Sequence, residues 1–126
     1  MNIINSTLKT EKISLQNYSI EGQFNVNPQY KKCISKVKEN VYKAQLSVSI
    51  TNTTENPFPI DLEIIFSGIF EFDQIENQKE LDTFLNINAI QIIFPYIRSL
   101  VSTITGASLM QPLVLPIVDT RAFKDN

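Results

Sequence analysis

Side chains able to do chemistry are few and scattered in this chain of 126 residues. It has no histidine and one cysteine, Cys33, which excludes a His-activated nucleophile and an ordinary zinc site within a single chain. Three glycines are too few for a glycine-rich phosphate loop. Cys33 is best interpreted as a half-buried strand residue. The sequence therefore predicts a binding protein with no cofactor and no metal, and not an enzyme.

Three carboxylates, Glu21, Asp61 and Glu63, are the clearest candidates for a charged surface. Each falls on the polar side of an apolar–polar alternation, so each is expected on the solvent face of its own strand. If those strands pack side by side, the carboxylates form an acidic and rather flat sheet face. A sheet face that is simply solvated explains the same residues, so the pattern alone leaves both alternatives open.

A second charged group consists of lysines within one expected strand. They could meet an acidic partner, but they are spread over both faces of the strand. Charges of this kind commonly protect an edge strand from unwanted pairing, so we interpret the group as a solvated edge. Its members are Lys31, Lys32, Lys36 and Lys38.

The composition indicates one domain covering residues 1–126. With 43% hydrophobic residues the chain can bury a substantial core. A net charge of −2 argues against nucleic acid as the main partner, because phosphate binding needs a concentrated basic surface. Residues 1–12 lack the apolar core of a signal peptide, and no uninterrupted apolar run reaches the length of a membrane span. We expect a cytoplasmic protein without membrane insertion.

The alternation of apolar and polar residues predicts strands. In the clearest one the alternation runs from Val41 to Thr51 without a fault, whereas Gly68 interrupts another and is expected to bulge or bend it. Residues 1–12 are expected to form a flexible lead-in. Sequential strands of this kind predict an antiparallel meander. The four expected strands are 18–26, 30–38, 41–51 and 60–72.

The best helix is expected at 92–106, where apolar residues fall on one face and small hydroxylated residues on the other. The small face suits close approach of another helix. Pro95 either occupies the first turn or kinks a longer helix that begins near Asn88. Gly106 stands where a C-terminal cap is expected.

The rest of the chain contributes one short helix and an extended end. Good helix formers predict a helix from Asn77 to Leu85. Residues 107–126 contain two prolines and are expected to be an extended segment, with no more than a final turn capped by Asp119 or Thr120. The predicted fold class is α+β: a four-stranded antiparallel, meander-like sheet with a short and a long helix packed on one side.

Several of these segments together resemble a known family. The run Gly68-Ile69-Phe70 is followed by Asn88, by Phe94-Pro95-Tyr96 with Arg98, and by a segment from Gln111 to Val118 that reads QPLVLPIV. This combination is similar to the protein-export chaperone SecB and its SecB-like relatives. The resemblance covers roughly residues 13–118 and is strongest after Gly68. The family fold, a four-stranded antiparallel sheet with helices on one side, agrees with the fold predicted from the pattern.

The resemblance implies an ATP-independent chaperone, or holdase, which binds unfolded polypeptides in apolar grooves and serves protein export through the Sec pathway. It also implies a homotetramer, a dimer of dimers, in which the long helix lies at the subunit interface. The interface residues would then be Ser99, Ser102, Thr103 and Gly106. Aromatic candidates for the client-binding groove are Tyr18, Phe24, Tyr42 and Phe66, although core packing explains these residues equally well.

In SecB-like proteins an acidic sheet face contacts the translocase motor SecA. Glu21 and Glu63 fall at matching positions and Asp61 lies beside them, whereas Asn25 is neutral where an acid is usual. Classical members continue into a second helix and a tail that also binds SecA. We therefore expect a truncated member in which client holding is better supported than delivery to SecA.

Two alternatives remain open. The chain could be a dedicated SecB-like chaperone of an antitoxin in a toxin–antitoxin system, a role that suits a truncated member. It could instead be a small-ligand binding domain that uses the space between sheet and helix, closed by the proline-containing segment. No convergent polar residues in the sequence specify such a ligand.

Overall fold

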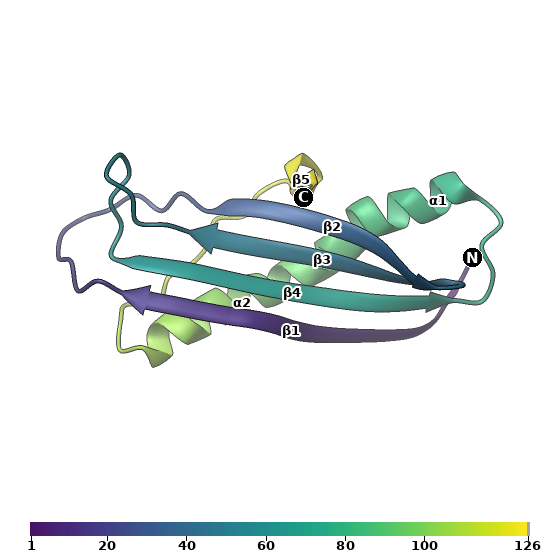
Figure 1. Ribbon diagram of the computed structural model, residues 1–126, viewed down its shortest axis with the longest axis horizontal. Helices are drawn as coiled ribbons and strands as arrows, with labels where there is room; N and C mark the ends of the chain where they lie inside the picture. Colours follow the sequence, from purple (N-terminus) through teal and green to yellow (C-terminus); the bar gives the residue numbers. More distant parts are fainter. Residues whose placement is uncertain (126) are drawn as a thin grey trace.

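The computed structural model describes residues 1–125 and has one sheet with a long helix across one face (Figure 1). Four strands are long: β1 (Ile3–Asn17), β2 (Gln29–Lys38), β3 (Val41–Ile50) and β4 (Ile60–Phe72). They are followed by α1 (Gln78–Thr83), the π-helical turn η1 (Phe84–Asn88), α2 (Ala89–Ala107), the 3-10 turn η2 (Thr120–Ala122) and β5 (Lys124–Asp125). The predicted α+β class is confirmed. Asn126, the last residue of the predicted extended segment, lies outside the described residues.

The order of strands in the sheet is β1-β4-β3-β2-β5, with β5 parallel to β2 and the other pairs antiparallel. The sheet therefore has five strands and not four. The predicted meander is present in β2, β3 and β4, but the first strand pairs with the far edge of β4 instead of with β2. Residues 18–28 consequently cross from one edge of the sheet to the other.

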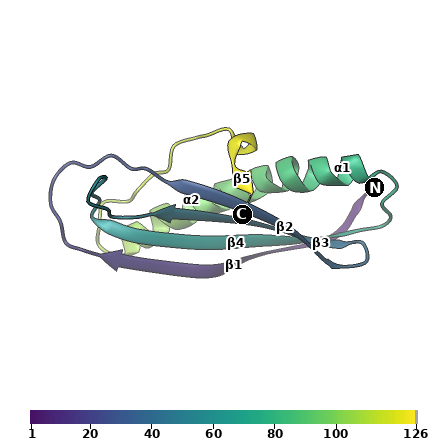
Figure 2. The same cartoon turned by 45° about the horizontal axis from the view of Figure 1, so that its top comes forward.

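The core lies between the sheet and α2, on the face that Figure 2 shows covered by the helices. On β3, Ala44, Leu46 and Val48 have no exposed surface, and they alternate with polar residues that face outward. Ile93 and Ile97 of α2 are equally buried against them. The strict alternation in β3 therefore predicted its inner face correctly.

The first strand was the main error in the sequence-based prediction. The segment expected to be a flexible lead-in forms most of β1, and the stretch expected to be a strand, 18–26, is a loop. β1 escaped notice because bulges at Ile4 and Glu11 shift its pairing with β4. The apolar residues of β1 that face inward are consequently not spaced at every second position along the sequence. They are Ile3, Leu8, Ile13 and Leu15.

The alternation in 18–26 does not form a strand because the backbone turns twice within it. Ser19 has a φ of 56° and Gly22 a φ of 137°, and neither value occurs in extended structure. Tyr18 and Ile20, which belong to the apolar series of the expected strand, are 42% and 41% exposed. Apolar side chains in this stretch therefore remain available at the surface.

The bulge expected at Gly68 is absent, since β3 and β4 pair without a shift through Ala44 and Gly68. The glycine is instead required by close packing. A Cβ atom there would lie 2.9 Å from both Leu8 Cδ2 and Phe70 Cε2. The bulges of this sheet occur on β1 and near the end of β2.

The short and long helices form one continuous helical segment from Gln78 to Ala107. It begins next to Asn77, close to the predicted start, and the Asn77 side chain caps it by accepting hydrogen bonds from the Lys79 and Glu80 amides. Pro95 lies inside α2 and not in its first turn. The expected cap at Gly106 is wrong: the helix runs to Ala107, Ser108 is its C-cap, and Leu109 takes the left-handed conformation with a φ of 61°.

This helical segment is long and apolar enough to cross a membrane by length and composition alone. Its apolar residues provide a different explanation, because Ile90, Ile93, Ile97 and Val101 are completely buried against the sheet. A core helix passes the same test of composition.

Candidate functional site

A cavity of about 380 Å³ lies where the loop 18–28, the start of β4 and the segment after α2 meet. Phe24 and Phe58 form an edge-to-face pair within it, with ring centroids 6.3 Å apart. Its other lining residues are mostly apolar or small: Gly22, Pro59, Ile60, Thr105, Met110, Gln111, Pro112 and Leu113. Figure 1 shows these segments gathered at one end of the sheet. The cavity is thus a hollow between two loop segments in which aromatic and aliphatic side chains lie beside polar groups.

Side chains of α2 hold the segment after the helix in place. Ser102 Oγ donates a hydrogen bond of 2.9 Å to the Leu113 carbonyl, and the Leu113 amide donates one of 2.8 Å to Thr105 Oγ1. Arg98 Nε donates one of 3.1 Å to the carbonyl of Leu115, whose side chain is completely buried. These bonds fix the backbone of the wall while its outer side chains stay free of the core.

Large apolar side chains are exposed on both segments that border the cavity. In the segment after α2, Leu109 is 98% exposed, Val114 65% and Ile117 83%. In the other segment, Tyr18 and Ile20 are each about two-fifths exposed. Apolar surface of this kind next to a hollow is typical of a binding site for apolar side chains.

Of the four aromatic residues predicted to bind clients, the structure places Phe24 in the cavity. Tyr18 lies nearby, but its hydroxyl donates a hydrogen bond to the Asp61 carboxylate. Phe66 is buried beneath Tyr96, with stacked ring centroids 5.6 Å apart. Tyr42 packs against Phe72 elsewhere on the inner face of the sheet.

The three predicted carboxylates do not form one acidic face. Asp61 and Glu63 lie on the outer face of β4, whereas Glu21 belongs to the loop 18–28. The Tyr18 hydroxyl, and then the Asn52 amide, lower the pKa of Asp61. Glu63 forms an ion pair of 2.6 Å with Lys12. The surface around them has mixed charge.

The predicted interface on α2 is divided into two parts. Ser102 and Gly106 are covered by the segment after the helix: Ser102 binds Leu113, and a Cβ at Gly106 would lie 3.3 Å from the Pro112 ring. Ser99 and Thr103 are exposed. They lie on the same helical stripe as two exposed apolar residues, Ile92 and Tyr96.

The motif that carried the resemblance has a structural explanation at three of its four positions. Phe94 is buried against Tyr30 and Phe123, Tyr96 covers Phe66, and Arg98 binds the Leu115 carbonyl. Pro95 is exposed within the helix, and its ring removes one helical hydrogen bond. The motif thus ties α2 to both the sheet and the C-terminal segment.

Comparison with known proteins identifies the family. The sequence model described as "Preprotein translocase subunit SecB" matches residues 7–125, nearly the whole chain. The chain belongs to the SecB family. It is similar to the protein-export protein SecB of Anaplasma phagocytophilum, with 29% identity over 84 residues that cover 65% of this chain and 53% of that protein. An uncharacterized protein of Methanocaldococcus jannaschii is 31% identical over 121 residues, covering 94% of this chain and 70% of the relative.

The fold of this SecB-family chain also matches a solved structure. The SecB-like chaperone of Mycobacterium tuberculosis, solved in complex with a peptide from an antitoxin, superimposes with a TM-score of 0.76. The match covers 93% of this chain and 89% of that one at 14% sequence identity, so it establishes the fold alone. The chain spans about half the length of several SecB relatives that it matches.

Sequence reasoning missed several residues of the cavity, including Phe58 and Met110, although it had the proline-containing segment of Pro112 close a space between sheet and helix as one alternative. Phe58 stands in a loop of turn-forming residues, and no periodicity marks it as a partner of Phe24. The signal that was present is the run of apolar residues between prolines after α2, because such a run is too apolar for an ordinary solvated loop.

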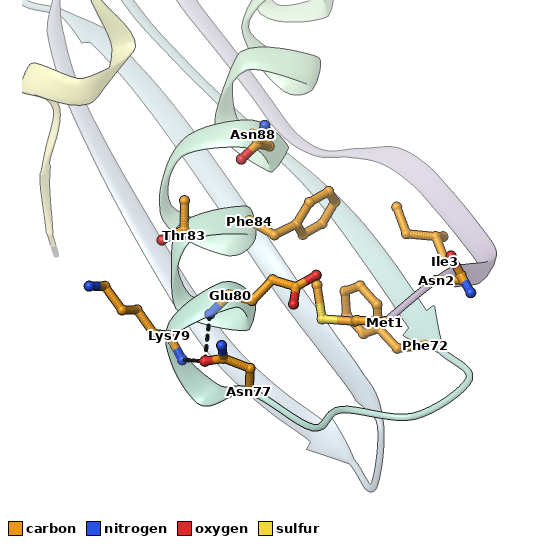
Figure 3. A pocket seen from close by; sticks show the side chains of 10 residues that line it. All are labelled: Met1, Asn2, Ile3, Phe72, Asn77, Lys79, Glu80, Thr83, Phe84 and Asn88. Carbon is orange, nitrogen blue, oxygen red and sulfur yellow. Dashed lines mark hydrogen bonds between the residues drawn. The ribbon is translucent and has the colours of Figure 1, made fainter.

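A second and larger hollow, about 660 Å³, lies at the other end of the sheet between the N-terminus and α1 (Figure 3). Its floor is apolar, with Met1, Phe72 and Phe84. The polar group drawn there with hydrogen bonds, Asn77, already caps α1 through the Lys79 and Glu80 amides. Within residues 1–125 no group of three or more His, Cys, Asp or Glu side chains could hold a metal ion.

Proposed function

We propose that this chain is an ATP-independent chaperone of the cytoplasm that holds unfolded polypeptides, with its client-binding groove at the cavity around Phe24 and Phe58. The observation that carries the proposal is the combination of this hollow, which holds the Phe24–Phe58 pair, with the exposed side chains of Leu109, Val114 and Ile117 on the segment that borders it. Unfolded chains expose apolar side chains in many sequences, and burial of apolar surface is non-directional. Such a surface therefore suits many clients without specific polar contacts.

Protein export is the role we favour for this activity. Family membership and the names of relatives such as the A. phagocytophilum protein support it. A contact with SecA through Asp61 and Glu63, with Glu21 from the loop, remains part of this proposal. The ion pair of Glu63 with Lys12 would have to open for that contact to form.

Chaperoning of an antitoxin is the alternative. The M. tuberculosis SecB-like chaperone was solved with an antitoxin peptide, and its fold is similar over nearly the whole chain. A general holdase suppresses aggregation of several unrelated proteins, whereas a dedicated chaperone acts on one. A small-ligand binding domain, the second alternative, would do neither.

We propose a homotetramer with the exposed stripe of α2 at an interface. Ser99 and Thr103 remain candidates for it, together with Tyr96. Ser102 and Gly106 contribute indirectly, because they hold the neighbouring segment. Thr103→Glu should lower the oligomer mass measured by light scattering, while Gln91→Glu, at an exposed position of α2 outside this stripe, should leave it unchanged. Equal masses for Thr103→Glu and the unmodified chain would reject this interface.

The client-binding groove is tested by an aggregation assay in which the chain and an unfolded protein are mixed at stoichiometric ratios. The double variant Leu109→Asn, Ile117→Ser removes exposed apolar surface without touching the core, and asparagine tolerates the left-handed backbone at Leu109. It should suppress aggregation several-fold less well than the unmodified chain. Ile4→Ser, on a 60% exposed residue of β1, is the matched control. Equal loss in both would contradict a groove at this position.

A further inference from the structure

The two aromatic residues of the cavity stand on different loops, and neither loop belongs to the sheet. Phe24 lies in the loop 18–28, which follows β1, and Phe58 lies in the loop 51–59, which joins β3 to β4. Figure 1 shows both loops at the same end of the sheet. The edge-to-face contact of the two rings, with centroids 6.3 Å apart, therefore depends on how the loops are held relative to each other.

The Asp61 carboxylate binds both loops. Asp61 is the second residue of β4 and lies on the outer face of the sheet. Its Oδ2 accepts a hydrogen bond from the Tyr18 hydroxyl at the start of the loop 18–28. Its Oδ1 accepts one of 2.7 Å from the Asn52 amide in the loop 51–59. One side chain on a regular strand thus connects two segments that are far apart in the sequence.

A second hydrogen bond carries this connection to Phe58. The Asn52 side chain accepts a hydrogen bond of 3.0 Å from the Phe58 amide, so Asn52 joins Asp61 to the backbone of the aromatic residue. Within the same loop, Thr53 Oγ1 accepts a hydrogen bond of 2.9 Å from the Asn56 amide and closes a tight turn. The loop between β3 and β4 is thus folded around Asn52.

On the other loop, Tyr18 is the anchored end. Besides the bond from its hydroxyl, its backbone amide donates a hydrogen bond of 2.9 Å to the Pro59 carbonyl. After Tyr18 the backbone turns at Ser19 and Gly22, both of which have a positive φ. A Cβ atom at Gly22 would lie 3.4 Å from Phe24 Cζ, so the Phe24 ring packs on the turn that Tyr18 starts. A change at this anchor should therefore move the ring.

The Asp61 carboxyl has the charge that suits this role. The Tyr18 hydroxyl, and then the Asn52 amide, lower its pKa, so the group is ionised at neutral pH and acts only as an acceptor. Hydrogen bonds to an ionised acceptor are shorter and stronger than those between neutral groups. Glu63, the next carboxylate on this face, is instead paired with Lys12 of β1. The two carboxylates therefore differ in what they hold.

We propose that Asp61 is a positioning residue of the client-binding groove: its carboxylate holds the loops 18–28 and 51–59 together and thereby fixes the Phe24–Phe58 pair before a client arrives. A groove whose walls are already ordered loses less conformational entropy when it binds. The inference rests on the proposed function where it concerns clients, whereas the geometry of the aromatic pair can be measured without one.

The geometry is tested by fluorine NMR of the free chain, with 4-fluorophenylalanine at position 58 alone. Tyr18→Phe removes one hydroxyl and should shift or broaden the fluorine resonance, because its loop loses the bond to Asp61. Asp61→Ala should have a larger effect, since both loops lose their acceptor, and Asp61→Asn should stay closer to the unmodified chain because an amide oxygen still accepts from Asn52. Glu71→Ala, which removes a carboxylate from the same face at the far end of β4, is the matched control and should leave the resonance unchanged.

The affinity for an unfolded client should follow the geometry of the pair. The probe is fluorescently labelled α-lactalbumin, kept unfolded by reduction and alkylation of its disulfides, and binding is followed by fluorescence anisotropy. Tyr18→Phe should weaken binding about threefold and Asp61→Ala about tenfold. The double variant should bind as Asp61→Ala does, because the Tyr18 hydroxyl has no acceptor once the carboxylate is gone. Glu71→Ala should bind like the unmodified chain.

An unchanged fluorine resonance in Asp61→Ala would overturn the proposal. Additive losses of affinity in the double variant, or an equal loss in Glu71→Ala, would do the same. If the resonance shifts as described while the unmodified chain binds no unfolded probe, the holdase proposal falls and the positioning of the aromatic pair stands. If Phe24→Ala weakens binding of the probe while the Asp61 variants do not, the groove stands and this role of Asp61 is rejected.

Discussion

One face of α2 packs on the sheet through Ile93, Ile97 and Val101, which are completely buried, whereas another face holds the C-terminal segment through Arg98 and Ser102. The first face contributes burial of apolar area, the main favourable term in folding. The second contributes a few hydrogen bonds, each worth about 0.5–1.5 kcal/mol. The helix therefore fixes the fold strongly and the wall of the groove weakly. A groove that accepts varied clients benefits from a wall of limited local stability.

The largest effect is expected on the sheet-facing side. Ile97→Ala removes buried methylene groups and leaves a cavity, so the free energy of unfolding should fall by about 2–5 kcal/mol. Urea denaturation followed by circular dichroism measures this change. A loss below about 1 kcal/mol would mean that this face is not the main source of stability, and it would contradict the contrast between the two faces of α2.

A smaller and local effect is expected on the face that holds the segment. Ser102→Ala removes the hydrogen bond to the Leu113 carbonyl, which should cost about 0.5–1.5 kcal/mol. Amide exchange in residues 108–118 should become faster while the core amides stay protected. Gln91→Ala, at an exposed position of the same helix outside the proposed interface, is the control and should change neither. Uniformly faster amide exchange over the whole chain would show that the two faces of α2 do not contribute independently to stability.

The smallest effect concerns the start of β1, at the other end of the molecule. The Asn2 amide and side chain, with the Gln74 amide, lower the pKa of Asp73 to about 2. Because the folded pKa lies below the ordinary aspartate value of 3.8, the carboxylate stabilises the fold above that value, and this contribution is lost as the pH falls from about 4 to 2. Asp73→Asn should reduce the loss of stability over this range. An identical acid transition in both proteins would contradict the assignment.

The elements with unbroken periodicity were predictable from the sequence. The strand from Val41 to Ile50 and the helix containing Ile93 and Ile97 each bury one face, so hydrophobic spacing and position agree. The start of a helix near Asn77 was also predictable, because helix-start signals are local and do not depend on distant contacts.

Features that depend on distant contacts were not predictable. The bulge at Glu11 hides β1 from a period-two search, and only the pairing with β4 reveals the strand. The cavity combines Phe24 with Phe58 and Pro112, residues that are remote in the sequence and have no shared pattern. Ser102 was assigned to a subunit interface because its small polar side chain suits one, yet in the fold it binds the chain's own Leu113.

Photo-crosslinking to an unfolded polypeptide tests the proposed groove most directly. A photoreactive amino acid in place of Leu109, directly before Met110 of the cavity lining, is compared with one in place of Ile4, which is also exposed but lies on β1. We predict strong crosslinking from position 109 and little from position 4. Equal yields from the two positions would contradict a client-binding groove around Phe24 and Phe58.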